Sequence, residues 1–185
     1  MKGPKGHPAE EDLHFIIYID GASRGNPGMA GAGVWMTNGE GKKQGELSRY
    51  LGHKTNNEAE YWALLLGLME VKRLGGESLH VFTDSELIER QVKGLYRVKD
   101  LKLKTLHQVV IENLRDFCSF EIESIPREEN READRLANDA IQRRIAREKG
   151  KEGSRRGRGG RSSSHPARRD GWGEESPSSK GQGGP

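Results

Sequence analysis

The sequence has little of what stabilises secreted or membrane proteins. One cysteine in 185 residues, Cys118, excludes an internal disulfide, and we expect this residue to be a small side chain of the core. No apolar run approaches the roughly 20 residues that span a bilayer. The charged, glycine-containing start also lacks the apolar segment of a signal peptide. We therefore expect a soluble, cytoplasmic protein without a membrane partner.

Apolar residues are also scarce, at 32% of the chain, and they lie between two polar ends. Residues 1–12 mix glycine, proline and charge without periodicity, and residues 147–185 contain one large apolar residue, Trp172. Segments with so little apolar surface do not offset the entropy lost on ordering them. We expect both ends to be disordered and residues 13–146 to fold as a single domain.

The positive charge of the chain belongs to its C-terminal segment. Residues 148–185 hold nine Lys or Arg and five Asp or Glu, a balance of +4, so the remainder of the +3 chain carries −1. The string SRRGRGGR in this segment is typical of Arg-Gly segments that contact nucleic acid without sequence preference. A solubilising tail is the alternative interpretation.

Hydrophobic periodicity predicts three strands, a helix, a strand, two helices, a strand and a final helix. The predicted strands are 13–19, 30–37, 43–50, 78–83 and 120–125, and the predicted helices are 56–74, 85–93, 102–117 and 130–145. Hairpins pair antiparallel, whereas strands linked through helices favour parallel pairing. We expect an α/β fold whose mixed five-stranded sheet, three antiparallel strands and then two parallel ones, carries helices on both faces.

Four carboxylates stand where a predicted strand ends or a predicted helix begins. Asp20 ends the apolar run FIIYI, Glu60 lies in TNNEAEYWALLLGL, Asp84 follows LHVFT and Asp134 lies in NREADRLAN. Acids in these positions can meet at one edge of the sheet, where the carboxyl ends of parallel strands gather ligands. Such a cluster repels itself unless a divalent cation takes its oxygens as ligands. The pattern indicates metal-dependent phosphoryl chemistry.

Each acid also has a plainer explanation when it is considered alone. Glu60 could be a surface residue that stabilises the helix dipole, Asp84 a helix N-cap, and Asp134 an exposed helical acid. Asp20 is harder to explain in this way, because a carboxylate at the end of a wholly apolar strand is desolvated and needs a partner.

The linked contexts of these acids resemble the type 1 ribonuclease H family. The strings YIDGASRGNPG, TNNEAEYWAL, FTDSELI and REENREADRLAN occur in this order over most of the predicted domain. The resemblance implies that Asp20, Glu60, Asp84 and Asp134 are catalytic acids that hold two Mg²⁺ or Mn²⁺ ions about 4 Å apart. It further implies that one ion activates a water and the other stabilises the leaving 3′ oxygen, giving 5′-phosphate and 3′-hydroxyl ends.

The resemblance also implies a substrate. Family members cut the RNA strand of RNA/DNA hybrids, and some relatives accept double-stranded RNA as well. Ser23, Asn26, Asn56 and Asn57 match positions that contact 2′-hydroxyls or sugar edges of the RNA strand. Thr55 matches a position that contacts a DNA-strand phosphate, besides being the predicted N-cap of its helix. We expect a monomer that binds such hybrids.

Two places depart from the family pattern. The loop before the last helix, SIPREEN, lacks the histidine that many members carry. Glu128 or Glu129 could serve there as an auxiliary acid, and solvated loop charge is the plainer alternative. Residues 92–103 are too short for the Trp-bearing basic handle of longer bacterial members, so the chain resembles the handle-less, archaeal-like subgroup.

Two rival functions are compatible with the same fold. A non-catalytic hybrid-binding module would require the loss of a metal ligand, and all four acids are present. A different nuclease of the superfamily, such as a junction resolvase or a proofreading exonuclease, would share the metal chemistry. The contexts NNEAEY and DGASRGNPG argue against this second alternative.

Overall fold

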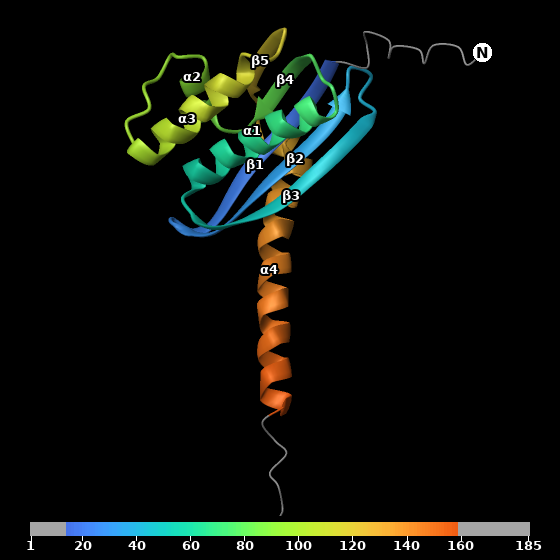
Figure 1. The fold of residues 1–185 in the computed structure, drawn as a ribbon, viewed down its shortest axis with the longest axis vertical. Helices are drawn as coiled ribbons and strands as arrows, with labels where there is room; N and C mark the ends of the chain where they lie inside the picture. Colours follow the sequence, from blue (N-terminus) through green and yellow to red (C-terminus); the bar gives the residue numbers. More distant parts are fainter. Residues whose placement is uncertain (1–13, 159–185) are drawn as a thin grey trace, which may run out of the picture.

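A computed structural model describes residues 14–158 of the protein, with side chains described as far as residue 150. Its elements follow the predicted order (Figure 1). They are β1 (His14–Gly25), β2 (Gly28–Asn38), β3 (Lys43–Lys54), α1 (Asn56–Arg73), β4 (Ser78–Thr83), α2 (Glu86–Val92), α3 (Leu101–Leu114), β5 (Ser119–Ser124), a 3-10 turn (Arg127–Glu129) and α4 (Arg131–Arg158). The disorder expected for residues 1–12 and for most of the C-terminal segment lies outside the described residues.

The five strands form one mixed sheet in the order β3-β2-β1-β4-β5. β1 pairs antiparallel with β2, and β2 with β3, whereas β1, β4 and β5 run parallel. Helices cover both faces: α1 and α3 pack together on one, and α4 packs on β2 and its neighbours on the other (Figure 1). The predicted five-stranded architecture is therefore confirmed, and the wholly apolar first strand occupies the centre.

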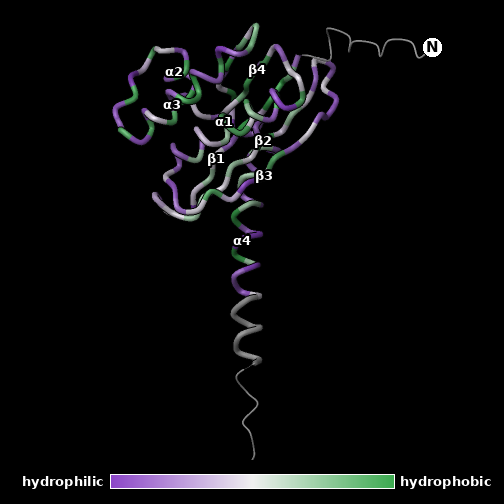
Figure 2. The backbone as a smooth tube through the Cα atoms, in the orientation of Figure 1, coloured by the Kyte–Doolittle hydropathy of each residue, from purple (hydrophilic) through white to green (hydrophobic). Residues whose placement is uncertain are grey.

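The main core lies between the sheet and the layer of α1 and α3. Ile17 and Ile19 of β1 and Val34 of β2 are fully buried there against Leu64 and Leu68 of α1. Figure 2 shows that hydrophobic residues concentrate in the strands and in the helices that pack on them. The apolar spacing of α1 that predicted a helix is thus the spacing of its buried face.

The start of α1 has the predicted capping box. Thr55 is the N-cap, and its Oγ1 accepts a hydrogen bond from the backbone N–H of Glu58 at 3.2 Å. In return, Oε2 of Glu58 accepts the backbone N–H of Thr55 at 2.8 Å. These bonds fix the residue at which α1 begins. They therefore also fix the position of Glu60, which lies near the start of this helix.

Several elements are longer than predicted, and two exceed their predicted ends by the most. β1 continues to Gly25 instead of ending near residue 19, so the segment expected to be a turn extends a long hairpin with β2. α4 continues to Arg158 instead of ending near residue 145. Its last turns are polar all round, so periodicity gave no sign of them. In the part of the chain that the structure describes, no helix is long and apolar enough to cross a bilayer.

The expected burial of Cys118 is wrong, because this residue is exposed. Phe117, one position earlier, takes the buried place in the turn after α3. The backbone N–H of Cys118 donates to the carbonyl of Glu77 at 2.8 Å and fixes the turn, while the thiol points away from the core.

α4 lies directly on β2 because two glycines leave room for its backbone. A Cβ on Gly33 would lie 2.1 Å from the carbonyl oxygen of Ala133, and one on Gly31 would approach the helix almost as closely. Gly33 is also the partner of Asp20 in the β1–β2 ladder. The close contact therefore brings the first turns of α4, which carry Asp134, to the level of Asp20.

We predict that Gly33→Ala lowers the free energy of unfolding by at least about 1–3 kcal/mol, because the added methyl group must displace α4. Urea unfolding monitored by circular dichroism measures this loss. Gly39→Ala is the matched control, since its nearest neighbour would be a side-chain atom of His14 at 3.9 Å. Equal stability of the two variants would contradict the close docking of α4 on β2.

Candidate active site and metal centre

Asp20 lies in β1, the central strand of the sheet, and is almost fully enclosed. Only 5% of the residue is exposed, and the carboxylate sits on the face that α4 covers. Burial, followed by the negative charges of Asp84 and Asp134, raises the pKa of Asp20 from 3.8 to about 7. The Arg127 guanidinium acts in the opposite direction. A carboxylate in this position needs a positive partner.

Glu60 is brought against Asp20 by the close approach of α1 to β1. A Cβ on Gly21 would lie 2.1 Å from the backbone nitrogen of Glu60, so only glycine fits there. Glu60 is 4% exposed, and its Oε2 has no hydrogen-bond partner among the described residues. Burial first, then the charges of Asp20 and Asp84, raise the pKa of Glu60 well above its ordinary value. The alternative of a surface acid is therefore wrong.

Asp84 completes a group of three carboxylates. One oxygen each from Asp20, Glu60 and Asp84 lies within 4.8 Å of the others. Asp84 follows β4, which pairs with β1, and this pairing places the two aspartates side by side. The N-cap of α2 is Ser85, whose side chain accepts the backbone N–H of Ile88. Capping therefore does not explain Asp84.

Asp134 stands beside this group and not within it. Its side chain is 28% exposed, and Oδ1 accepts a hydrogen bond from Arg127 Nη2 at 2.5 Å. Its charge nevertheless contributes to the raised pKa of Asp20. The structure thus gathers the four predicted acids at one edge of the sheet, three as a tight cluster and the fourth held by an arginine.

Three polar residues of the site were not predicted. Arg127 lines the cavity above the acids, and Asn138 donates from Nδ2 to the carbonyl oxygen and Oδ2 of Asp134 at 3.0 and 3.2 Å. Buried Asn130 donates to the carbonyl of Ile19 at 2.8 Å and ties the start of α4 to β1. The four-residue spacing from Asp134 to Asn138, one helical turn, could have identified one of them.

The acids suit hard divalent cations. Asp20, Glu60 and Asp84 border a cavity of about 260 Å³, which Arg127 also lines. The unpartnered Oε2 of Glu60 and the three converging carboxylate oxygens are the oxygen donors that Mg²⁺ and related ions prefer. The residues present therefore fit a divalent metal centre.

Two of the predicted substrate residues line this cavity, and the other three are their neighbours in the β1–β2 hairpin and at the start of α1. Ser23 and Asn56 line it, and Oδ1 of Asn26 accepts the backbone N–H of Asn56 at 3.2 Å, which joins the β1–β2 hairpin to α1. Asn57 is exposed in the first turn of α1, directly after Asn56 and the N-cap Thr55. The structure brings these five positions together, and their contacts with RNA or DNA stay predictions.

The two candidate auxiliary acids lie in the 3-10 turn before α4, and both are exposed. Glu128 lines a separate shallow cavity with Arg127 and Asp134, at the edge of the acidic cluster. Glu129 lines neither of these two cavities. Glu128 therefore shares a cavity with Asp134 whereas Glu129 does not, and the role of both residues stays a prediction.

A family model described as reverse transcriptase-like matches residues 18–140. The chain is 38% identical over 124 residues to ribonuclease HI of Halobacterium salinarum, covering 67% of this chain and 62% of that protein. It is 40% identical over 131 residues to a bifunctional protein of Mycobacterium tuberculosis, covering 70% of this chain and 36% of the relative. The chain thus spans less than two thirds of the length of either relative.

The chain is also similar to solved ribonuclease H structures. The crystal structure of the compost-derived LC11 ribonuclease H1, solved in complex with an RNA/DNA hybrid, has a TM-score of 0.68 and 40% identity, covering 71% of this chain and 99% of that one. The matched region contains every acid of the cluster and the strands and helices that position them. The chain therefore belongs to the type 1 ribonuclease H family.

Proposed function

We propose that the protein is an endoribonuclease that hydrolyses the RNA strand of RNA/DNA hybrids with the help of divalent metal ions. The observation that carries this proposal is the convergence of three buried carboxylate oxygens within 4.8 Å, beside Asp134 and under an open cavity. The hybrid bound to the related LC11 enzyme supports the choice of substrate. A scaffold module would have no need to retain such a repulsive cluster.

Asp20, Glu60, Asp84 and Asp134 would hold two Mg²⁺ or Mn²⁺ ions. Two such ions, when bound, supply an activated water and neutralise the charge that develops on the leaving 3′ oxygen. Arg127 holds the carboxylate of Asp134 in place and adds positive charge next to the position of the scissile phosphate. Hydrolysis in this arrangement leaves a 5′-phosphate and a 3′-hydroxyl.

Small polar side chains beside the acids would select RNA. The one hydrogen of the Ser23 hydroxyl faces two carbonyl oxygens, those of Gly25 at 2.5 Å and Lys54 at 2.8 Å, so the lone pairs of its oxygen are left to act as acceptors. An acceptor in this position suits a ribose 2′-hydroxyl, which DNA lacks. Asn56 lies on the other side of the same cavity and offers an amide to the sugar edge.

The ions would also relieve the repulsion within the cluster. Both Asp20 and Glu60 have raised pKa values, since their charged forms are desolvated and close to one another. When the pKa of a carboxyl group is higher in the folded chain than in the unfolded chain, the free energy of unfolding falls as the pH rises from the unfolded-state pKa to the folded-state pKa. Without metal, ionisation of the site therefore destabilises the protein.

We predict that Asp84→Asn lowers the rate of hybrid cleavage at least about a hundredfold, more than is typical of losing a residue outside the ligand set. Labelled hybrid, duplex RNA, duplex DNA and single strands, each with Mg²⁺, Mn²⁺ or EDTA, form the assay. We expect cleavage of the RNA strand of the hybrid, dependent on the metal, and 5′-phosphate ends. Binding of the hybrid without any metal-dependent cleavage would identify a scaffold instead.

We predict that Asp20→Asn stabilises the protein in EDTA, and increasingly so from about pH 4 to about pH 7. The upper limit is about 4 kcal/mol, because each unit of pKa shift corresponds to about 1.4 kcal/mol. Urea unfolding across this pH range measures the difference. Mg²⁺ should raise the stability of the parent protein and have a smaller effect on the variant. A difference that is constant with pH would contradict the repulsion described here.

A further inference from the structure

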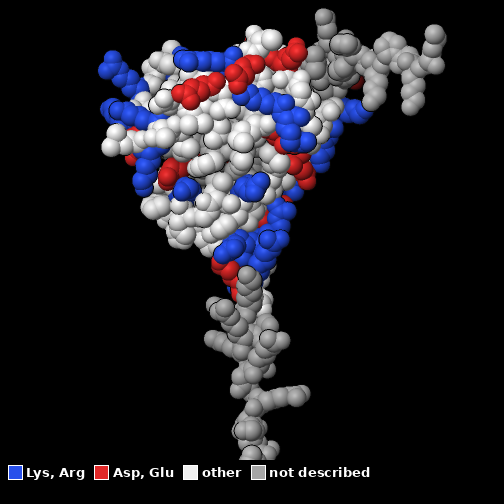
Figure 3. Space-filling view, in the orientation of Figure 1, with Lys and Arg blue, Asp and Glu red and all other residues white. Residues whose placement is uncertain are grey.

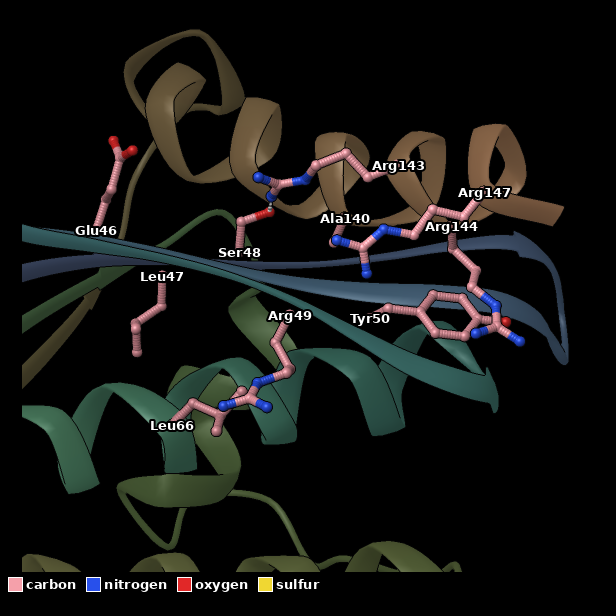
Figure 4. A pocket seen from close by; sticks show the side chains of 10 residues that line it. All are labelled: Glu46, Leu47, Ser48, Arg49, Tyr50, Leu66, Ala140, Arg143, Arg144 and Arg147. Carbon is pink, nitrogen blue, oxygen red and sulfur yellow. Dashed lines mark hydrogen bonds between the residues drawn. The ribbon is translucent and has the colours of Figure 1, made fainter. Parts of the chain in front are cut away.

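A second cavity, twice as large as that of the active site, lies at the free edge of the sheet between β3 and α4. Its volume is about 520 Å³, against about 260 Å³ beside the acids. Its walls are rich in arginine (Figure 4). We call it the arginine groove and define it by Arg49, Tyr50, Arg143, Arg144 and Arg147.

The arginines reach β3 from two sides. Figure 4 shows Arg143, Arg144 and Arg147 extending from α4 towards the strand, while Arg49 leaves the opposite face of β3 in the direction of α1. The guanidinium carbon of Arg144 lies 5.4 Å from the ring centroid of Tyr50. In the space-filling view, Lys and Arg gather where α4 leaves the sheet (Figure 3).

Most of this positive charge is not neutralised by the protein. Within residues 14–150, Arg49, Arg143 and Arg147 form no ion pair with a carboxylate, whereas Arg144 pairs with Glu148 at 2.8 Å. Arg143 donates a hydrogen bond to the hydroxyl of Ser48, a contact that orients its guanidinium without changing its charge. The guanidinium groups of Arg49, Arg143 and Arg147 therefore keep positive charge that a bound anion would neutralise.

The single acid of the groove does not balance these charges. Glu46 pairs with Lys43 at 2.9 Å and lies 3.8 Å from Arg135, so its charge is already shared by two other cations. The groove therefore presents a net positive surface with planar donors, the type of group that binds phosphate in two parallel hydrogen bonds.

We propose that the arginine groove binds the phosphodiester backbone of a single nucleic-acid strand that extends beyond the hybrid. Charge complementarity favours a polyanion, and a cavity of about 520 Å³ is too small to enclose a duplex. Tyr50, on the α4 side of β3 (Figure 4), supplies an aromatic ring on which an unpaired base can stack. α4 connects the two sites, since Asp134 lies in its first turn and Arg147 in a later one.

This proposal rests on the proposed function only in that the substrate is a nucleic acid. The test uses protein carrying Asp84→Asn, so that the substrate stays intact, and compares Arg49→Gln/Arg147→Gln with the parent. Neither arginine has an ion pair in the described region, so their loss leaves the internal contacts of the domain in place. Arg97→Gln/Arg115→Gln is the matched control, because it removes the same charge from exposed positions after α2 and after α3, and neither arginine has an ion pair in the described region.

The measurement is fluorescence anisotropy of a labelled blunt hybrid and of the same hybrid with a single-stranded extension, across a range of salt concentrations. We expect the extension to tighten binding by the parent and by the control, but not by the groove variant. For the extended hybrid, the slope of log association constant against log salt concentration should be shallower by about 1.4 in the groove variant than in the parent. Two phosphate contacts are lost, and each single-strand contact contributes about 0.7 to the slope. If the extension increases the binding affinity of the groove variant as much as that of the control, the proposal is overturned.

Two further arms identify what the groove binds and protect the test from misfolding. Arg147→Ala alone should give about half the change in salt dependence. If the groove variant loses binding to phosphatidylglycerol vesicles while keeping the effect of the extension, the groove serves a membrane surface and the proposal falls.

Cleavage by protein with Asp84 intact is scored separately. If the single-stranded extension tightens binding but no cleavage occurs, the proposed function is wrong and the groove proposal stands. If cleavage occurs but the extension does not tighten binding, the groove proposal is wrong and the proposed function stands.

Discussion

Mutual repulsion among buried carboxylates is the constraint on which the rest of this molecule depends. Asp20 and Glu60 are each about 5% exposed or less, and with Asp84 they bring oxygens within 4.8 Å of one another. Such an arrangement is unfavourable for the protein alone, because each charge is desolvated and faces another of the same sign. Folding holds the cluster together with energy from the apolar core, and under the proposed function a divalent cation would turn the repulsion into ligand binding.

The fold meets this constraint through close contacts between backbones. Gly21 lets α1 touch β1 and delivers Glu60, and Gly33 lets α4 touch β2 and delivers Asp134. Parallel pairing of β4 with β1 brings Asp84 alongside Asp20. Each acid thus comes from a different element, and the precision of the site follows from how closely those elements pack. The same α4 carries the chain from the catalytic edge to the arginine groove, so one helix serves both surfaces.

Much of this could be predicted from the sequence, because the determining signals are local. The apolar runs and the Thr55 capping box set the elements, and the ends of two apolar runs marked Asp20 and Asp84, although β1 itself continues past Asp20 to Gly25. What could not be predicted depends on contacts between distant segments. Arg127 appeared as one charge in a polar loop, and the groove combines one arginine of β3, Arg49, with arginines about a hundred positions later in α4. Cys118 was misplaced because apolar neighbours do not show which residue of a turn points inward.

Anomalous diffraction at the manganese edge tests the central claim most directly, on crystals grown with Mn²⁺ and a hybrid that resists cleavage. The account predicts two peaks about 4 Å apart, in contact with the carboxylates of Asp20, Glu60, Asp84 and Asp134. Well-ordered crystals containing bound hybrid, but without an anomalous peak between these carboxylates, would contradict it.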